Sequence, residues 1–503
     1  MMNSQYEILS TSDDSNVYLN DSVENDDNLE NDTERIEDDS QSIVEIDESI
    51  KEPRVSTIKY EALIPISRPP TKGRDVSYFW IFTLHLGFLA SIGIFSQDNF
   101  FHDTILLYKK EGGFAYSLVV ATLIGSILGI ALSIGISTTS LADILLSLAT
   151  PLSIVLQIIL ANIFLAIKTK YWYFGVVVLI SAISDSIFFK VTQENLKVSK
   201  TLLEMAIKIL QKYGYSYSIA VLFTVFMQTC LVLWWGIVFN NVITHVSPNI
   251  AIVLVMVLIF SLYWTVQLFH SIMATVSGGC ILWYFLKEES DSLNPENRVF
   301  LYMQVALTSS IGSICKGALL APFSQSILST INTYKYYSNI YVGSSSCRAL
   351  FNKTFSNFSN VYNFARYHHR LSFSYIATFG FTFNRAACAL IENSENLGIV
   401  LDDSTSFLLK TLATGISCSF ALLISLTTMK EEGSLWPLFL ILCFLLIHSG
   451  ISLVLHSLRS AVDGLIVAYS LKPIKFAEEN SILFHRFLRR TETALVEDAS
   501  GNL

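Results

Sequence analysis

Charged residues are missing from the longest apolar part of this sequence. Between Lys212 and Lys287, 74 successive residues include no Asp, Glu, Lys or Arg. A charge-free run well beyond about 18 residues indicates membrane spans, because one buried soluble helix would not need that length. Over the whole chain 15% of residues are charged and 52% are hydrophobic, with a mean hydropathy of +0.49. These values exclude a soluble globular protein, and the continuous apolar runs exclude the alternating pattern of a β-barrel.

Several chemical signatures are also absent. The seven cysteines show no CxxC or Cys/His spacing, so neither a disulfide framework nor a zinc site is indicated. The sequence has no P-loop, HExxH or nucleotide fingerprint, which argues against ATP-driven transport by this chain alone. We therefore expect no metal, no cofactor and no nucleic-acid partner. The N-terminus is acidic and lacks a short apolar core, so we expect the first membrane helix to serve as the insertion signal.

Acidic residues are concentrated at the start of the chain. Residues 1–50 hold 16 acids and one base, Arg35, whereas the rest of the chain carries a net charge of +6. Such an acidic, polar tail cannot bury enough apolar surface to order itself. We predict a disordered tail with a basic pre-membrane segment over 1–73, a transmembrane domain over 74–470 and a cytoplasmic C-terminal tail over 471–503.

The apolar segments predict an all-α, polytopic membrane protein with about ten transmembrane helices. The expected spans are 76–97, 112–137, 143–167, 171–189, 215–239, 248–286, 299–331, 371–391, 404–429 and 433–458. Five lysines in 190–212 and the basic segment before the first span place both termini in the cytoplasm. Residues 332–370 contain five bases and no acid, which favours a cytoplasmic position. Ten simple spans would instead place these residues outside. The alternative is that 299–331 re-enters the membrane and 371–391 lies at its surface.

The span 248–286 is too long to cross a bilayer straight. At about 1.5 Å per residue its 39 residues would reach about 58 Å, nearly twice a hydrocarbon core of about 30 Å. It must tilt, protrude or break, and Gly278-Gly279 is the expected break. Gly312 and Gly317 are a second candidate break near a solute path, with close helix packing as the alternative. For Gly125 and Gly129 the spacing favours close packing.

Aromatic residues cluster in and around this span. Trp264 lies within it, with Gln267 one turn further on, and an aromatic box with few full charges suits a quaternary ammonium ion. Core packing is the alternative for Trp264, and an interfacial aromatic belt is the alternative for the residues near span ends. The candidate substrate-binding residues are Trp235, Trp264, Gln267, Trp283 and Tyr284. Lys316 would repel a cation, so we expect it to face water, lipid phosphate or an acidic partner.

Five stretches together resemble the choline transporter-like family, most closely its fungal-type branch with a short first external loop. They are RDVSYFWIFTLHLGFLASIG (74–93), YWTVQLFHSIMATVSGGCILWYF (263–285), SSIGSICKGALLAPF (309–323), FNRAACALIENSENLGIVLDDSTSFLL (383–409) and SLRSAVDGLIVAYS (457–470). The resemblance implies about ten helices, cytoplasmic termini and movement of choline or a related amine, with exchange against a cation or proton as one mode. It also implies that Trp264, Gln267 and Trp283 belong to the pathway.

The leading hypothesis is a secondary or facilitative transporter of choline or a similar small organic cation, resident in the plasma membrane or in an internal membrane. Its expected partners are that cation and the lipid bilayer. The alternative is a membrane scaffold or lipid-handling protein that kept the fold without choline transport. His448 and His456 would suit a membrane acyltransferase, but no acid–base constellation accompanies them, so we expect no enzyme activity.

Overall fold

The computed structural model describes residues 70, 73–95, 113–137, 139–166, 172–287, 295–341, 369–392, 403–428 and 436–488. All the regular secondary structure in these ranges is helical, which confirms the all-α prediction. The acidic tail over 1–50 and most of the 332–370 segment lie outside the described residues. The prediction of a disordered tail therefore stays a prediction.

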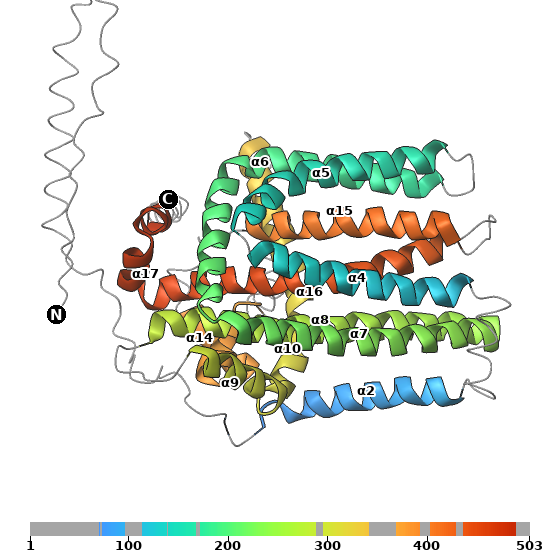
Figure 1. Cartoon of the computed structure of the whole chain (residues 1–503), viewed down its shortest axis with the longest axis horizontal. Coiled ribbons are helices and arrows are strands. Elements are labelled where there is room, and N and C mark those ends of the chain that lie inside the picture. The colour runs from blue at the N-terminus through green and yellow to red at the C-terminus, as the bar shows by residue number, and fades with distance from the viewer. Residues whose placement is uncertain are drawn as a thin grey trace, which may run out of the picture. The chain divides into compact units, whose positions relative to one another are not determined.

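The described helices follow one another along the chain (Figure 1). They are α2 (Val76–Phe95), α4 (Gly113–Ser137), α5 (Thr139–Ala166), α6 (Trp172–Gln211), α7 (Gly214–His245), α8 (Pro248–Leu286), α9 (Pro295–Leu307), α10 (Ile311–Tyr341), α13 (Ser372–Phe379), α14 (Phe383–Glu392), α15 (Asp403–Thr428), α16 (Trp436–Leu471) and α17 (Pro473–Glu479).

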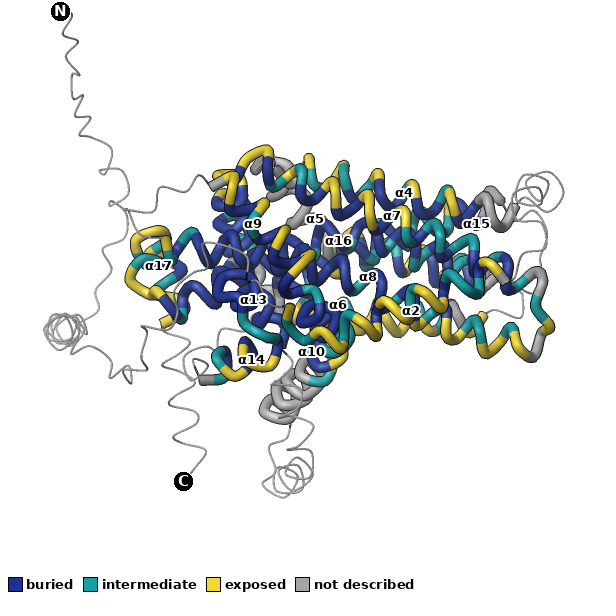
Figure 2. Tube along the Cα trace, turned by 90° about the horizontal axis from the view of Figure 1, so that it is seen from below, coloured by how far each residue is buried: buried dark blue, intermediate teal, exposed yellow. Residues whose placement is uncertain are grey.

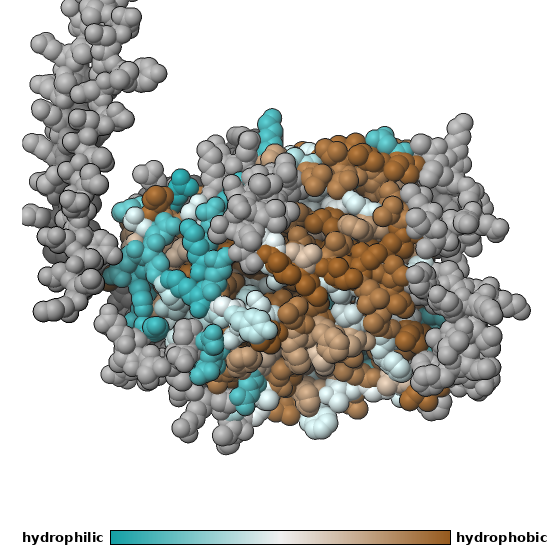
Figure 3. Space-filling view, viewed as in Figure 1, coloured by the Kyte–Doolittle hydropathy of each residue, from teal (hydrophilic) through white to brown (hydrophobic). Residues whose placement is uncertain are grey.

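The long helices form a membrane-spanning bundle. Within the described residues six helices are long and apolar enough to cross a membrane, or seven if the bent pair α9–α10 is one span. Two shorter apolar stretches, Pro151–Leu165 in α5 and Gly175–Ile187 in α6, run beside them. Apolar side chains cover the face of these helices in Figure 3, whereas hydrophilic side chains gather near α17. The chain is therefore a polytopic membrane protein.

Helix α16 lies at the centre of the bundle, packed against α4, α8 and α15. Glycines allow its close approach to α4. A Cβ atom on Gly125 would lie 2.7 Å from Ile447 Cα, and one on Gly129 would lie 2.6 Å from the Gly450 carbonyl oxygen. The expected packing role of Gly125 and Gly129 is confirmed.

Helix α8 is continuous through Gly278 and Gly279, so the predicted break there is wrong. Both glycines instead serve close packing against α13. A Cβ atom on Gly278 would lie 2.3 Å from Ser374 Oγ, and one on Gly279 would lie 2.5 Å from Ala377 Cβ. Apolar side chains in the first half of α8, such as Ile252 and Met256, are about two-thirds exposed. Residues 268–283 in its second half are all buried (Figure 2).

The break in the chain occurs instead between α9 and α10, which bend by 77°. Residues 299–331 therefore do not form one straight span. Gly312 stands just after the bend, where a Cβ atom would lie 2.3 Å from the Asp75 carbonyl oxygen. The break that we expected near Gly312 is thus present. Gly317 lies inside continuous α10, wedged against the Phe373 and Phe383 rings, so it marks packing and not a break.

Asp75 holds the bend in place from the start of α2. Its carboxylate accepts hydrogen bonds from Ser313 Oγ (2.6 Å) and from the Phe383 backbone N–H (3.2 Å). The Arg74 N–H donates to the Ser309 carbonyl at 2.9 Å. These bonds join the pre-membrane segment to α10 and α14.

Residues 371–391 do not form the expected continuous span. They fold as α13, with eight residues, and α14, with ten, separated by Gly380 in the left-handed region at φ 62°. At about 1.5 Å per residue these helices are about 12 and 15 Å long, so neither crosses a hydrocarbon core of about 30 Å. The ten-helix count itself stays a prediction.

Candidate functional site

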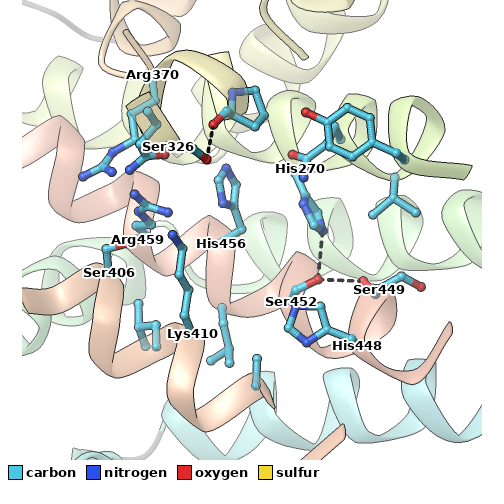
Figure 4. A pocket seen from close by; sticks show the side chains of 18 of the residues that line it. His270, Ser326, Arg370, Ser406, Lys410, His448, Ser449, Ser452, His456 and Arg459 are labelled. Atoms are coloured by element: carbon cyan, nitrogen blue, oxygen red, sulfur yellow. Dashed lines mark hydrogen bonds between the residues drawn. The ribbon is translucent and has the colours of Figure 1, made fainter. Parts of the chain in front are cut away.

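A cavity of about 1050 Å³ opens between α6, α8, α10, α15 and α16, beside α13. Its polar and aromatic lining is unusual for the interior of an apolar bundle (Figure 4). The lining includes Asp185, Tyr263, Gln267, His270, Gln325, Ser326, Arg370, Phe373, Ser406, Phe407, Lys410, His448, Ser449, Ser452, His456 and Arg459. Polar side chains inside an apolar bundle make this cavity the candidate site, because hydrocarbon would not solvate them.

One helical face of α16 supplies much of this lining. His448, Ser452, His456 and Arg459 follow one another at intervals of three or four residues, so all project in nearly one direction. Ser452 Oγ lies 3.2 Å from His270 Nε2 of α8, and the His270 and His456 rings stack with centroids 5.1 Å apart. Histidines from two helices therefore meet on one side of the cavity (Figure 4).

Cationic side chains gather on the side of the cavity away from His270 and His448. There Arg370, Lys410 and Arg459 lie near Ser406, on the left of Figure 4. Arg370 Nε donates to Asp463 Oδ2 at 2.7 Å, and both side chains are buried. Burial and the adjacent Arg370 guanidinium lower the pKa of His369 to about 3. The His369 ring is thus neutral near pH 7, and its Nδ1 accepts the Leu371 N–H at 3.2 Å.

Asp185 supplies the only carboxylate among the described residues that line the cavity. Gln157 Nε2 donates to Asp185 Oδ2 at 2.8 Å, which fixes the side chain between α5 and α6. The rings of Tyr263, Phe373 and Phe407 border the same space. An acidic oxygen and aromatic rings in one cavity can attract an organic cation.

The sequence profile of a family described as plasma-membrane choline transporter matches residues 176–473. That range covers more than half of the chain and includes every described residue that lines the cavity. The chain belongs to the choline transporter family. A CTL-like protein of Dictyostelium discoideum is 24% identical over 440 residues, which cover 83% of this chain and 75% of that protein. The cavity is thus part of the region that defines this choline transporter family member.

The structure places one predicted substrate-binding residue at the cavity. Gln267 lines it, and so does Tyr263, which the sequence reasoning did not select. Trp264 is buried on another side of α8, where its Nε1 donates to the Cys315 carbonyl at 3.2 Å. Its ring lies 5.2 Å from that of Phe82. Trp264 thus joins α8 to α2 and α10.

The other predicted aromatic residues join helices away from the cavity. Trp235 Nε1 donates to the Leu258 carbonyl at 2.7 Å, which ties α7 to α8. The Arg298 guanidinium of α9 lies 4.9 Å from the centroid of the buried Trp283 ring. Tyr284 is hydrogen-bonded to Lys212 and to Glu479 of α17. None of Trp235, Trp283 and Tyr284 is among the described lining residues.

Lys316 and Asp463 also differ from expectation. Lys316 Nζ donates to Asn384 Oδ1 at 2.7 Å and lies 5.3 Å from the centroid of the Tyr78 ring. Its partner is therefore an amide, and it joins α10 to α14 and α2. Asp463 lies near the cytoplasmic end of its apolar segment, which from the sequence favours interfacial anchoring. In the structure its side chain is buried and paired with Arg370. The predicted span ends at residue 458 and leaves out Arg459 and Asp463, whereas α16 continues to Leu471.

Proposed function

We propose that this protein carries choline or a related small organic cation across the membrane through the cavity between α6, α8, α10, α15 and α16. The observation that carries the proposal is the meeting of Asp185, Tyr263 and Gln267 at one cavity inside the family-matched region. Its volume of about 1050 Å³ exceeds what a small cation needs, which leaves room for water and for a second solute. Transport would be secondary or facilitative, with exchange against a cation or proton as one mode.

The chemistry of the cavity suits a quaternary ammonium ion. Such an ion cannot donate hydrogen bonds, so a protein holds it by aromatic faces and by a nearby negative charge. Tyr263 and Phe373 supply rings, and Asp185 supplies the charge. The Gln267 side-chain oxygen could accept a hydrogen bond from the hydroxyl of choline, which would distinguish choline from an ammonium ion without a hydroxyl.

The family description supports residence in the plasma membrane. The lysines of 190–212 and the basic residues that follow α16 support cytoplasmic termini, because basic loops remain inside. Under this orientation the buried half of α8 and the bend between α9 and α10 lie toward the cytoplasm.

Asp185→Asn should weaken choline uptake by reconstituted protein. The amide keeps the size of the side chain but removes the one carboxylate of the described lining, so we expect KM to rise by about tenfold, which corresponds to about 1.4 kcal/mol. Asp185→Glu should keep most of the affinity. Glu479→Gln, on α17 outside the cavity, is the matched control and should leave KM unchanged. Unchanged KM in Asp185→Asn would contradict the proposal, and absent uptake by the unmodified protein would favour the scaffold or lipid-handling alternative.

Tyr263 and Trp264 provide a second comparison on one turn of α8. Tyr263→Leu should raise the KM for choline several-fold, because cation–π attraction contributes about 0.5–2 kcal/mol. Tyr263→Phe should retain the ring and most of the affinity. Trp264→Phe loses the hydrogen bond to Cys315 but keeps an aromatic ring against Phe82, so it should lower thermal stability with little change in KM. The reverse order of effects would place the solute at Trp264.

A further inference from the structure

The cavity contains more positive than negative charge, which is unexpected for a site that admits a cation. Among its described lining residues Arg370, Lys410 and Arg459 are cationic, whereas Asp185 alone is acidic. Asp463 lies outside the lining and neutralises Arg370 through its 2.7 Å ion pair. Two cations, Lys410 and Arg459, then stand against one carboxylate, and that carboxylate already accepts a hydrogen bond from Gln157.

Arg459 is the cation whose buried nitrogens this imbalance affects most. Its exposed fraction is 5%, and its Nε and Nη2 atoms are buried with no hydrogen-bond partner among the described residues. Asp463 follows it by one helical turn, but the Asp463 carboxylate is bound to Arg370. A buried guanidinium without a counter-charge costs several kcal/mol. Such a group is stable when a mobile anion accompanies it.

The side chains around Arg459 are suited to an oxyanion. Figure 4 shows Arg459 beside Lys410 and Ser406 of α15 and beside His456 of its own helix. Ser406 and Lys410 are four residues apart, so both lie on one face of α15. A guanidinium offers a planar fork of N–H groups that matches two oxygens of a phosphate, and an ammonium adds a point charge. A hydroxyl supplies one further donor.

We infer that Arg459, Lys410 and Ser406 form a binding site for a phosphate-type oxyanion at one side of the cavity. The phosphate could belong to a phospholipid headgroup that enters between the helices or to a free phosphate or phosphate monoester. Bound there, it would neutralise the cationic side of the cavity and lower the electrostatic barrier to an organic cation near Asp185. The inference deepens the proposed function because the two solutes share one cavity. It does not require that choline be the cation.

The test uses the full chain purified in a phosphate-free, non-ionic detergent. Two measurements are made: the thermal unfolding midpoint with and without inorganic phosphate, and the amount of phospholipid that stays bound to the protein. Arg459→Gln should weaken either form of binding by tenfold or more, because a charge-assisted hydrogen bond contributes about 1.5–3 kcal/mol. Lys472→Gln removes an exposed cation outside the cavity and should change neither result.

The outcomes distinguish the two sources. Stabilisation of the unmodified protein by phosphate that Arg459→Gln removes would support a free anion. Tightly bound phospholipid that Arg459→Gln releases would support a headgroup. No stabilisation and no bound phospholipid, or either one retained in Arg459→Gln, would overturn the inference. Should Arg459→Gln fail to fold, Lys410→Gln carries the same test, because Lys410 is an exposed side chain of α15. Choline binding is measured separately, so that a failure of the proposed transport function can be told apart from a failure of the phosphate site.

Discussion

Replacing Gly450 by alanine should clearly destabilise the protein, because the added methyl group would meet the backbone of α4. The new Cβ atom would lie 2.4 Å from the Gly125 carbonyl carbon and 2.6 Å from the Gly125 carbonyl oxygen. Both are backbone atoms of α4, so no flexible side chain can move aside. Overpacking of this kind costs about 1–3 kcal/mol or more, because the helices must separate. We expect a clear fall in the thermal unfolding midpoint of the purified protein.

Gly236→Ala in α7 provides the matched control. No atom lies within 4 Å of the Cβ that this substitution adds, so it should be neutral or slightly stabilising, since alanine favours a helix by about 1 kcal/mol over glycine. Equal unfolding midpoints for Gly450→Ala and Gly236→Ala would contradict the packing of α4 against α16. Because α16 also packs against α8 and α15, its displacement should reduce choline uptake as well.

Helix content was predictable from the sequence, because hydropathy alone determines which segments must leave water. The positions of helix breaks were not. Gly278-Gly279 has the composition of a weak point, yet α8 continues through it because the missing side chains let α13 approach. The bend occurs over residues 308–310, where the Asp75 carboxylate from another part of the chain binds Ser313. A local pattern does not reveal such a distant partner.

Only some of the residues that line the cavity could be predicted from the sequence. Successive residues in an α-helix point about 100° apart, so Tyr263 can face the cavity while Trp264 faces α2 and α10. The sequence around them is apolar on every side, and its periodicity cannot say which face meets solute. Gln267 was found because an amide in a span needs a partner. Arg459 was missed because hydropathy ended its span one residue too early.

Removing the counter-charge of Arg370 should strongly destabilise the protein. Asp463→Asn keeps the size of the side chain but leaves the Arg370 guanidinium buried beside a neutral amide. The side chains of Arg370 and Asp463 are 7% and 6% exposed, so the lost charge is poorly screened by bulk solvent. Breaking such a pair costs roughly 3–5 kcal/mol. The unfolding midpoint of Asp463→Asn should therefore fall sharply, whereas Glu478→Gln, an exposed acid on α17, should leave it unchanged.

The double variant Arg370→Gln/Asp463→Asn separates the pair from its surroundings. With both charges gone the two amides can bond to each other, so the double variant should be more stable than Asp463→Asn, because losing both charges of a buried pair costs less than losing one. Additive losses would show that the ion pair is not the cause. Uptake provides an independent reading, since Arg370 lines the cavity. Asp463→Asn leaves the positive charge of Arg370 uncompensated at the cavity and should raise the KM for choline. The double variant removes that positive charge, so its KM should return toward the value of the unmodified protein.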